Sequence, residues 1–495
     1  MAEHLLPDGV SIAHPTSLYI DGRWVAPAGG GTIEVVSPNS EQVVAIVAEG
    51  GEADMDAAVD AAARAFAGPW SRTRPEERIR LIRALGAALA ERQSELAAAW
   101  TAQVGGLASF APMMVGGGTA TFTNVANVAE KFQFEKPVAS MMAAAGVIAY
   151  EPVGVVAAIA PWNAPYAIMA GKVAPALAAG CTVVMKPSPE TPLEAYIIAE
   201  AAEAVGIPAG VVNLVPSHRE AADYLVRNPR VDKVSFTGST VAGRRIASVC
   251  GERIARCSLE LGGKSAAIVR DDFATEQAAK LLANTISIMS GQVCAMLSRV
   301  IVPRTRHDEL ADAIAGEMKQ IRLGHSDDPE TRMGPLAMQR QLERVEDYIA
   351  KGKAEGADML TGGARATQFN RGYFLEPTLF ANVSNDQTIA QEEIFGPVLS
   401  LIPCEDEEDA IRIANDSIYG LSGSVLTNDA DAAYRIARRV RTGTIAQNGL
   451  KGDFTLPFGG FKQSGLGREG GEEGLMEYLE SKTILLDAAP ATLAV

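Results

Sequence analysis

A chain of 495 residues, 47% hydrophobic and 21% charged, is long enough for two or three globular lobes and excludes a disordered protein. The net charge of −16 argues against nucleic-acid binding, because phosphates require clustered Lys and Arg. The five cysteines are odd in number and lack a CxxC motif, which argues against a disulfide framework or a zinc site. They favour a reducing, cytoplasmic setting.

No targeting or membrane segment is predicted. Residues Met1–Gly9 lack a basic stretch followed by an apolar run, so we expect no signal peptide. The uncharged run Pro152–Gly171 contains several prolines and Asn163, which favours a buried strand, a turn and a helix over a membrane span.

The first half of the chain predicts an α/β lobe. Short strands are expected within residues 1–50, and helices from about residue 53 to 134, with a break at Gly105-Gly106 and a flexible point at Gly116-Gly117-Gly118. Apolar strands then alternate with helices, with strands at 153–160, 182–185, 211–215, 231–236 and 253–259 and helices at 166–179, 192–205 and from 240. This alternation predicts a parallel sheet covered by helices, which binds ligands at the carboxyl ends of its strands.

The second half predicts another lobe of the same class. Helices are expected at 275–289, 306–321 and 335–354, and strands at 299–302, 397–402 and 421–426. The segments at 140–151 and 483–486 fit neither lobe, so we expect them to form a small arm used in self-association.

The first candidate for chemistry is Cys294, in Gly291-Gln292-Val293-Cys294-Ala295, 34 residues after Glu260. A lone cysteine is usually a small buried apolar residue. A thiol and a carboxyl group are also the parts of a two-step acyl transfer, in which the thiolate attacks a carbonyl and the carboxylate directs water onto the thioester. No histidine lies close in sequence to a cysteine, so a Cys–His hydrolase would depend on a histidine brought in by the fold.

Asn163 lies between two prolines directly after an apolar strand. An asparagine there is often only a turn residue. It is also suited to stabilise an oxyanion, because its amide is held rigidly at the carboxyl edge of the sheet.

Two segments are candidate cofactor contacts. Phe236-Thr237-Gly238-Ser239-Thr240 follows a strand and opens a helix, so its backbone N–H groups suit a phosphate, although the same residues also make an ordinary helix cap. Lys186 ends a strand and has the length to reach a ribose or phosphate oxygen, although it also fits an ordinary surface lysine. Gly465–Gly470 matches GxGxxG, but it follows a loop and is rejected as a dinucleotide site.

Along nearly its whole length the sequence resembles the NAD(P)-dependent aldehyde dehydrogenase superfamily. Seven motifs occur in family order: Pro161-Trp162-Asn163, Lys186-Pro187-Ser188, Phe236–Thr240, Glu260–Ser265, Gly291–Cys294, Glu392–Pro397, and Pro457–Gly460 with Lys462 and Ser464-Gly465. The resemblance implies two doubly wound α/β lobes and a small β arm. It predicts an NAD(P)-binding domain at 1–131 and 152–262, a catalytic domain at 263–470, a bridging arm at 132–151 and 471–495, and assembly as a homodimer or homotetramer.

The resemblance also implies catalytic roles by matching position. Cys294 is expected to be the nucleophile, and Asn163 with the backbone N–H of Cys294 the oxyanion hole. Glu260 is expected to be the general base for thioester hydrolysis, and Lys172 and Glu469 to relay its protons. No metal is implied.

Cofactor contacts follow from the same resemblance. They are expected at Trp162, Lys186, Ser188, Glu190, Gly238, Ser239, Gly262, Glu393 and Phe395, with Glu393 at the nicotinamide ribose and Lys186 at the adenosine ribose. NAD-preferring relatives carry Glu three residues after the lysine, where this chain has Pro189 and places the acid at Glu190. Glu190 still suits a ribose and repels a 2′-phosphate, whereas Arg219 suits the extra phosphate of NADP. NAD is favoured, with NADP as the alternative.

Small or apolar residues line the expected substrate side: Ala164, Ile168, Gly171, Val293, Ala295 and Phe458. No arginine lies immediately beside Cys294 to bind a distal carboxylate. We therefore expect a roomy apolar tunnel for an aromatic, terpenoid or longer aliphatic aldehyde, unless other loops fill it.

Three rival functions are also to be considered for these motifs. A CoA-acylating enzyme of the same family is disfavoured by Glu260, since that base serves hydrolysis. A cofactor-free cysteine hydrolase or amidotransferase predicts activity without NAD(P). A structural protein without activity is disfavoured by the intact set of Cys294, Glu260 and Asn163.

Overall fold

The computed structural model describes residues 5–490. The segment examined for a signal peptide, Met1–Gly9, and the predicted arm, 471–495, therefore lie partly outside the described residues. No helix within residues 5–490 is long and apolar enough to cross a membrane.

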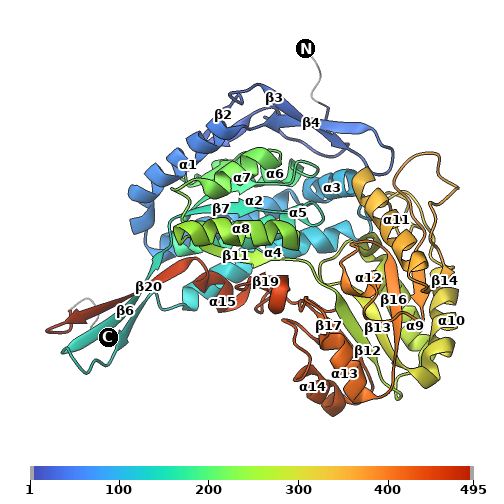
Figure 1. Cartoon of the computed structure of the whole chain (residues 1–495). Helices are drawn as coiled ribbons and strands as arrows, with labels where there is room; N and C mark the ends of the chain where they lie inside the picture. Colours follow the sequence, from blue (N-terminus) through green and yellow to red (C-terminus); the bar gives the residue numbers. More distant parts are fainter. Residues whose placement is uncertain (1–4, 491–495) are drawn as a thin grey trace.

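The first lobe is built around an eight-stranded sheet of order β19-β11-β10-β7-β8-β9-β1-β2 (Figure 1). Its strands are β1 (Leu18–Ile20), β2 (Arg23–Val25), β7 (Val155–Ile159), β8 (Thr182–Lys186), β9 (Val212–Leu214), β10 (Lys233–Thr237), β11 (Arg256–Glu260) and β19 (Gly465–Leu466). The five central strands, β11, β10, β7, β8 and β9, are parallel, as their apolar runs predicted. β1, β2 and β19 add antiparallel edges.

Helices cover both faces of this sheet because alternate residues of a strand point to opposite sides. Along β7, Val156 and Ala158 pack in one core with residues of α2 to α6, whereas Val155 and Ala157 pack in a second core with residues of α1, α7 and α8. The helices are α1 (Glu52–Ala67), α2 (Pro75–Glu91), α3 (Gln93–Val104), α4 (Ala111–Lys131), α5 (Pro165–Ala179), α6 (Leu193–Ala204), α7 (Arg219–Arg227) and α8 (Thr240–Arg253).

The second lobe contains a seven-stranded sheet of order β14-β15-β16-β13-β12-β17-β18, in which only β14 is antiparallel. Its strands are β12 (Ser265–Val269), β13 (Leu297–Pro303), β14 (Asp358–Thr361), β15 (Thr378–Ala381), β16 (Val398–Cys404), β17 (Gly423–Leu426) and β18 (Ala446–Gln447). Its helices are α9 (Thr275–Ser287), α10 (His307–Met318), α11 (Gln339–Ala354), α12 (Thr388–Gln391), α13 (Glu407–Asn415) and α14 (Ala430–Ala437). Separate apolar cores lie on the two faces.

Two smaller sheets complete the fold. β5 (Glu135–Val138), β6 (Ala145–Pro152) and β20 (Leu479–Leu486) form an antiparallel sheet that projects from the first lobe, away from the second (Figure 1). β3 (Gly31–Val36) pairs with β4 (Val43–Glu49), and α15 (Gly471–Met476) precedes β20. The segments that fitted neither lobe in sequence thus share one sheet.

The structure corrects two predicted local features. Gly116-Gly117-Gly118 is not a flexible point but lies inside α4. At Gly118 the helix packs so closely on α5 that a Cβ there would lie 2.6 Å from the Tyr166 ring. The strand expected from residue 253 begins at Arg256, since α8 continues to Arg253. β19, within the segment expected to be the catalytic domain, pairs with β11 of the first sheet.

Candidate active site

Four predicted site segments meet at one edge of the first sheet. Strand register aligns Ile159 with Lys186, Phe236 with Ile159, and Thr237 with Glu260. The carboxyl ends of β7, β8, β10 and β11 therefore lie together. The backbone N–H of Gly238 donates to the Glu260 carbonyl at 3.0 Å, which joins the predicted phosphate loop to the predicted base.

Cys294 lies on an irregular segment between α9 and β13. Met289 and Ser290 adopt positive φ angles of 50° and 54°, an uncommon conformation for such residues that reverses the chain before the cysteine. Gln292 holds the segment in place, since its Nε2 donates to the Met289 carbonyl at 2.9 Å and its Oε1 accepts from the Ala337 N–H at 2.9 Å.

The Asn163 amide reaches this segment from the other lobe. Its Nδ2 donates to the Gln292 carbonyl at 3.0 Å, and the backbone carbonyl of Asn163 accepts from the Trp100 indole N–H at 3.1 Å. Nδ2 carries two hydrogens, so one fixes the amide and the second remains for another acceptor. The structure thus joins Asn163 to Gln292, which lies two residues before Cys294 in the chain.

The half-buried Cys294 thiol is protonated at neutral pH. Burial raises its pKa to about 12, and the charges of Glu393 and Glu260 contribute in the same direction. A thiolate therefore requires added positive charge or loss of these negative charges.

The Glu260 carboxyl group is buried, and neither of its oxygens has a hydrogen-bond partner among the described residues. Burial raises its pKa well above the usual range, Glu469 raises it further, and Lys172 opposes this shift. Gly459 borders the carboxyl group closely, since a Cβ there would lie 2.6 Å from Glu260 Oε1. A carboxyl group without partners in a confined space is suited to exchange a proton with water.

Lys172 and Glu469 form an ion pair beside Glu260. Lys172 Nζ lies 2.7 Å from Glu469 Oε1, and the lysine is completely buried. Lys172 Nζ also donates to Ser235 Oγ at 3.4 Å, and the Tyr478 hydroxyl donates to the same oxygen at 3.0 Å. Ser235 and Tyr478 therefore orient the ammonium group toward Glu469.

Lys186, Ser188 and Glu190 cluster after β8. Burial lowers the pKa of Lys186 to about 8, with Glu190 opposing the shift. The Ser188 hydroxyl donates to the Glu190 carboxylate. Across the edge, Ser239 caps α8 by accepting from the Ala242 N–H at 3.3 Å, so the helix begins at Thr240 as predicted.

Glu393 lies between the two lobes. Its Oε1 accepts from the Gly263 N–H at 3.1 Å, and burial raises its pKa to about 7. A Cβ at Gly262 would lie 2.2 Å from Glu393 Oε2, so only glycine permits this approach. Trp162 of the first lobe and Phe395 of the second contact each other edge to face, with ring centroids 5.3 Å apart.

A family model described as the aldehyde dehydrogenase family matches residues 24–484. The chain belongs to the aldehyde dehydrogenase family. It is accordingly an oxidoreductase that acts on aldehydes. It is 42% identical over 471 residues to 3-succinoylsemialdehyde-pyridine dehydrogenase of a Pseudomonas species, covering 94% of this chain and 98% of the relative. It is 41% identical to geranial dehydrogenase of Castellaniella defragrans, covering 95% and 98%.

Solved aldehyde dehydrogenases share the whole fold. Aldehyde dehydrogenase C of Pseudomonas syringae, a cysteine-to-alanine variant in complex with NAD+ and octanal, matches with a TM-score of 0.93 at 39% identity, over 97% of this chain and 99% of that chain. Betaine aldehyde dehydrogenase of Staphylococcus aureus with NAD+ matches with a TM-score of 0.94 at 37% identity, over 97% of each chain. The aldehyde dehydrogenase fold and the two α/β lobes predicted from sequence are thereby confirmed.

The residues expected to line the aldehyde tunnel come from both lobes. Ala164, Ile168 and Gly171 lie on one face of α5 or at its cap, since they are four and three residues apart. A Cβ at Gly171 would make an ordinary van der Waals contact with Glu469 Oε2, at 3.5 Å, so there is room for a small side chain beside it. Phe458 pairs through its backbone with Glu469.

Two of the six residues expected to line the tunnel are packed within the protein. Val293 packs against the apolar core of the second lobe, and Ala295 is buried. Phe454, which was not among the predicted site residues, is 58% exposed and lies beside the Phe458 ring, with centroids 6.1 Å apart. The signal available in the sequence was an aromatic residue four positions before Phe458, in a segment that contains Gly and Pro.

The sequence also left two residues of α11 without a role. Gln341 Nε2 donates to the carbonyls of Ile394 and Phe395 at 3.1 and 2.7 Å, and Arg344 donates to the Glu393 carbonyl at 2.6 Å. Both therefore hold the segment that carries Glu393 and Phe395. Their spacing of three residues on a predicted helix placed them on one face, but nothing in the sequence identified the segment they contact.

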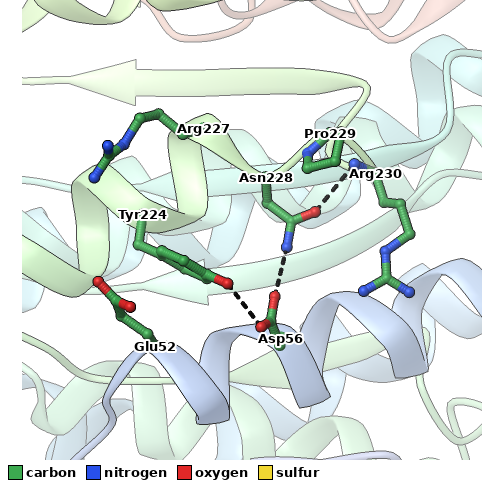
Figure 2. Close-up of a pocket in the computed structure, with 7 residues that line it drawn as sticks. All are labelled: Glu52, Asp56, Tyr224, Arg227, Asn228, Pro229 and Arg230. Atoms are coloured by element: carbon green, nitrogen blue, oxygen red, sulfur yellow. Dashed lines mark hydrogen bonds between the residues drawn. The ribbon is translucent and has the colours of Figure 1, made fainter.

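Two surface hollows lie away from these residues. One, of about 530 Å³, is lined by residues of α1, α7 and the loop after α7: Glu52, Asp56, Tyr224, Arg227, Asn228, Pro229 and Arg230 (Figure 2). Asp56 accepts from the Tyr224 hydroxyl at 2.7 Å and from the Asn228 amide at 2.9 Å, so these polar groups serve to join α1 to α7. The other borders α2, α4 and the base of the arm.

Proposed function

We propose that the protein oxidises an apolar aldehyde to its carboxylic acid with NAD(P)+ through a thioester on Cys294. The observation that carries this proposal is the buried Glu260 carboxyl group, which has no hydrogen-bond partner among the described residues and lies close enough to Cys294 for its charge to raise the thiol's pKa. A base free to bind water is what hydrolysis of a thioester requires.

The residues at the sheet edge fit the cofactor. The α8 N-terminus after Gly238-Ser239 suits a phosphate, and Lys186 and Glu190 suit a ribose. The Thr237 hydroxyl at this edge is buried and lacks a partner among the described residues, which supports a polar ligand there. The NAD+ complexes of the similar dehydrogenases from Pseudomonas syringae and Staphylococcus aureus support NAD as the favoured cofactor, with NADP as an alternative.

In the proposed mechanism the Cys294 thiolate adds to the carbonyl carbon of the aldehyde. The free Nδ2 hydrogen of Asn163 and the backbone N–H of Cys294 donate to the oxyanion. The bound cofactor supplies the hydride acceptor, and its positive nicotinamide favours the thiolate. Glu260 then takes a proton from the water that attacks the thioester, and the Lys172–Glu469 pair carries that proton away from it.

The remaining contacts position these groups. Trp162, Ser188, Gly262, Glu393 and Phe395 are proposed cofactor contacts: Trp162 contacts Phe395, Gly262 borders Glu393, and Ser188 donates to Glu190. We assign residues 1–131 and 152–262 to the cofactor domain, 263–470 to the catalytic domain, and 132–151 and 471–495 to the arm. The enzyme would act in the reducing cytoplasm, where free cysteines persist.

An apolar aldehyde is supported by the room for a small side chain at Gly171, by the small or apolar residues Ala164, Ile168 and Phe458, and by the relatives named for geranial and for a complex with octanal. A panel of octanal, geranial, benzaldehyde, acetaldehyde, succinic semialdehyde and betaine aldehyde, followed by NADH or NADPH absorbance, tests the proposal. We expect the highest kcat/KM among the first three and no dependence on CoA. A higher kcat/KM for acetaldehyde or succinic semialdehyde refutes the apolar substrate, and no turnover with any aldehyde refutes the reaction.

Self-association through the arm is also proposed. β20 and β5 are the outer strands of the arm sheet, so each has an edge without a partner strand among the described residues. Unpaired strand edges readily pair with another chain. Light scattering after size exclusion should give a dimer or tetramer, and a monomer would refute this assembly.

A further inference from the structure

One helix of the second lobe, α11, contacts both ends of the proposed cofactor cleft. Gln341 and Arg344 hold the segment that carries Glu393 and Phe395, at the proposed nicotinamide end. Arg340, at the start of the same helix, reaches the first lobe at the proposed adenosine end, where Glu190 lies. A ligand bound along the sheet edge would therefore meet Arg340 as well as the residues of the first lobe.

Arg340 forms an ion pair with Glu190. Arg340 Nη1 lies 2.5 Å from Glu190 Oε1, and the side chains are 64% and 22% exposed respectively. Burial raises the pKa of Glu190, but Arg340 and the Ser188 hydroxyl lower it by more, so the carboxylate stays ionised. Arg340 thus covers an anionic group on its solvent side.

The ionisable side chains of this cluster are Lys186, Glu190 and Arg340. With the arginine they sum to one positive charge when Lys186 is protonated, and without it the carboxylate is no longer compensated at its solvent side. An isolated Glu190 would accept hydrogen bonds from ribose hydroxyls and repel a 2′-phosphate, which carries negative charge. A paired Glu190 repels it much less.

We propose that Arg340 is a specificity-determining residue that lets the protein bind NADP as well as NAD. Arg340 Nη1 stays paired with Glu190 and neutralises it, while the remaining N–H groups of the exposed guanidinium donate to the 2′-phosphate. The inference rests on the proposed function, since it assumes that the adenosine ribose binds beside Lys186 and Glu190.

Calorimetric titration with NAD and with NADP tests this inference without relying on turnover, and kcat/KM for both cofactors is measured in parallel. The purified full chain should bind both. In Arg340→Ala the ratio of NADP to NAD affinity should fall at least about tenfold, the effect of losing one charge-assisted hydrogen bond. Glu190→Gln should raise the ratio, and the double variant should recover most of the loss, because the uncovered carboxylate is then absent.

Arg365→Ala is the matched control. Arg365 forms an exposed ion pair with Glu346 of α11, at 2.6 Å, and among the described residues neither side chain forms a hydrogen bond or ion pair with Glu190. This variant should leave the cofactor ratio unchanged. Arg340→Gln, which keeps a polar side chain of similar length, replaces Arg340→Ala if that variant does not fold, and should lower the ratio in the same direction.

Two outcomes separate the inference from the function beneath it. If Arg340→Ala changes the affinities for NAD and NADP by the same factor, or changes neither, Arg340 does not set cofactor specificity although NAD-dependent oxidation stands. If the unaltered protein binds neither cofactor and oxidises no aldehyde, the proposed function itself fails.

Discussion

Replacing Asn163 with alanine removes the proposed side-chain donor to the oxyanion while leaving Cys294 in place. The amide makes one hydrogen bond to this segment, from Nδ2 to the Gln292 carbonyl at 3.0 Å. Gln292 keeps its bonds to Met289 and Ala337, at 2.9 Å each, so the cysteine segment stays anchored. The loss of stability should be about 1–3 kcal/mol, because the Gln292 carbonyl becomes a buried acceptor with one partner fewer.

The single-turnover rate should fall as well, because the transition state loses a hydrogen-bond donor. An oxyanion donor in a buried site contributes about 10²–10³-fold to the rate, or about 2.7–4 kcal/mol of transition-state free energy. Stopped-flow measurement of NADH formation in a single turnover isolates the steps in which the oxyanion exists. Affinity for NAD should be unchanged, since Asn163 is not a proposed cofactor contact.

Asn213→Ala is the control for a lost buried amide. Asn213 is completely buried in β9, and its amide donates to the Gly210 carbonyl at 2.8 Å and accepts from the Asp21 N–H at 3.1 Å. This variant should lose stability but keep its single-turnover rate. If Asn163→Ala stays within about threefold of the unaltered protein, or if Asn213→Ala slows equally, the oxyanion role is refuted.

Three further predictions concern charge and space. Lys172→Met removes a cation that lowers the pKa of Glu260, so the pH at which kcat rises should move to more alkaline values. Glu469→Gln removes a negative charge that raises the pKa of Glu260, so the pH at which kcat rises should move to more acid values. If both variants shifted this pH in the same direction, the relay would be contradicted. Because the pKa of Cys294 is about 12, iodoacetamide should alkylate it slowly at pH 7.5 without cofactor and faster with NAD+, and a rate equal to that of free cysteine would contradict the buried resting thiol. Gly171→Leu fills the space beside Glu469 and should lower kcat/KM for octanal about tenfold while sparing acetaldehyde, and equal loss for both would place the tunnel elsewhere.

Local sequence patterns predicted the parallel strands well. β7 and β8 are uncharged apolar runs apart from the terminal Lys186, flanked by turn residues, so their burial on both faces followed from composition. The glycine triplet of α4 was misread because its local preference opposes a helix, by roughly 1 kcal/mol for each glycine. Packing of Gly118 against Tyr166 is a contact between distant segments, and such contacts override local preference.

The candidate site divides in the same way. The motifs led to the proposal of Cys294, Glu260 and Asn163 as site residues, but not of their partners, since Gln292 and Asn163 lie 129 residues apart. The Arg340–Glu190 pair depends on how the two lobes dock, which no spacing encodes. Lys264 belongs to a recognised motif, yet its burial, which lowers its pKa to about 7, depends on the second lobe closing over it.

The most direct test of the central claim is a rapid-quench experiment on Glu260→Gln with octanal and NAD+. Cys294 should still form the thioester, whereas water is no longer activated to hydrolyse it. We expect a burst of about one NADH per subunit, followed by slow turnover, and an intact-protein mass increased by one octanoyl group on Cys294. Turnover at the unaltered rate with no acyl adduct would contradict the assignment of Glu260 as the hydrolytic base.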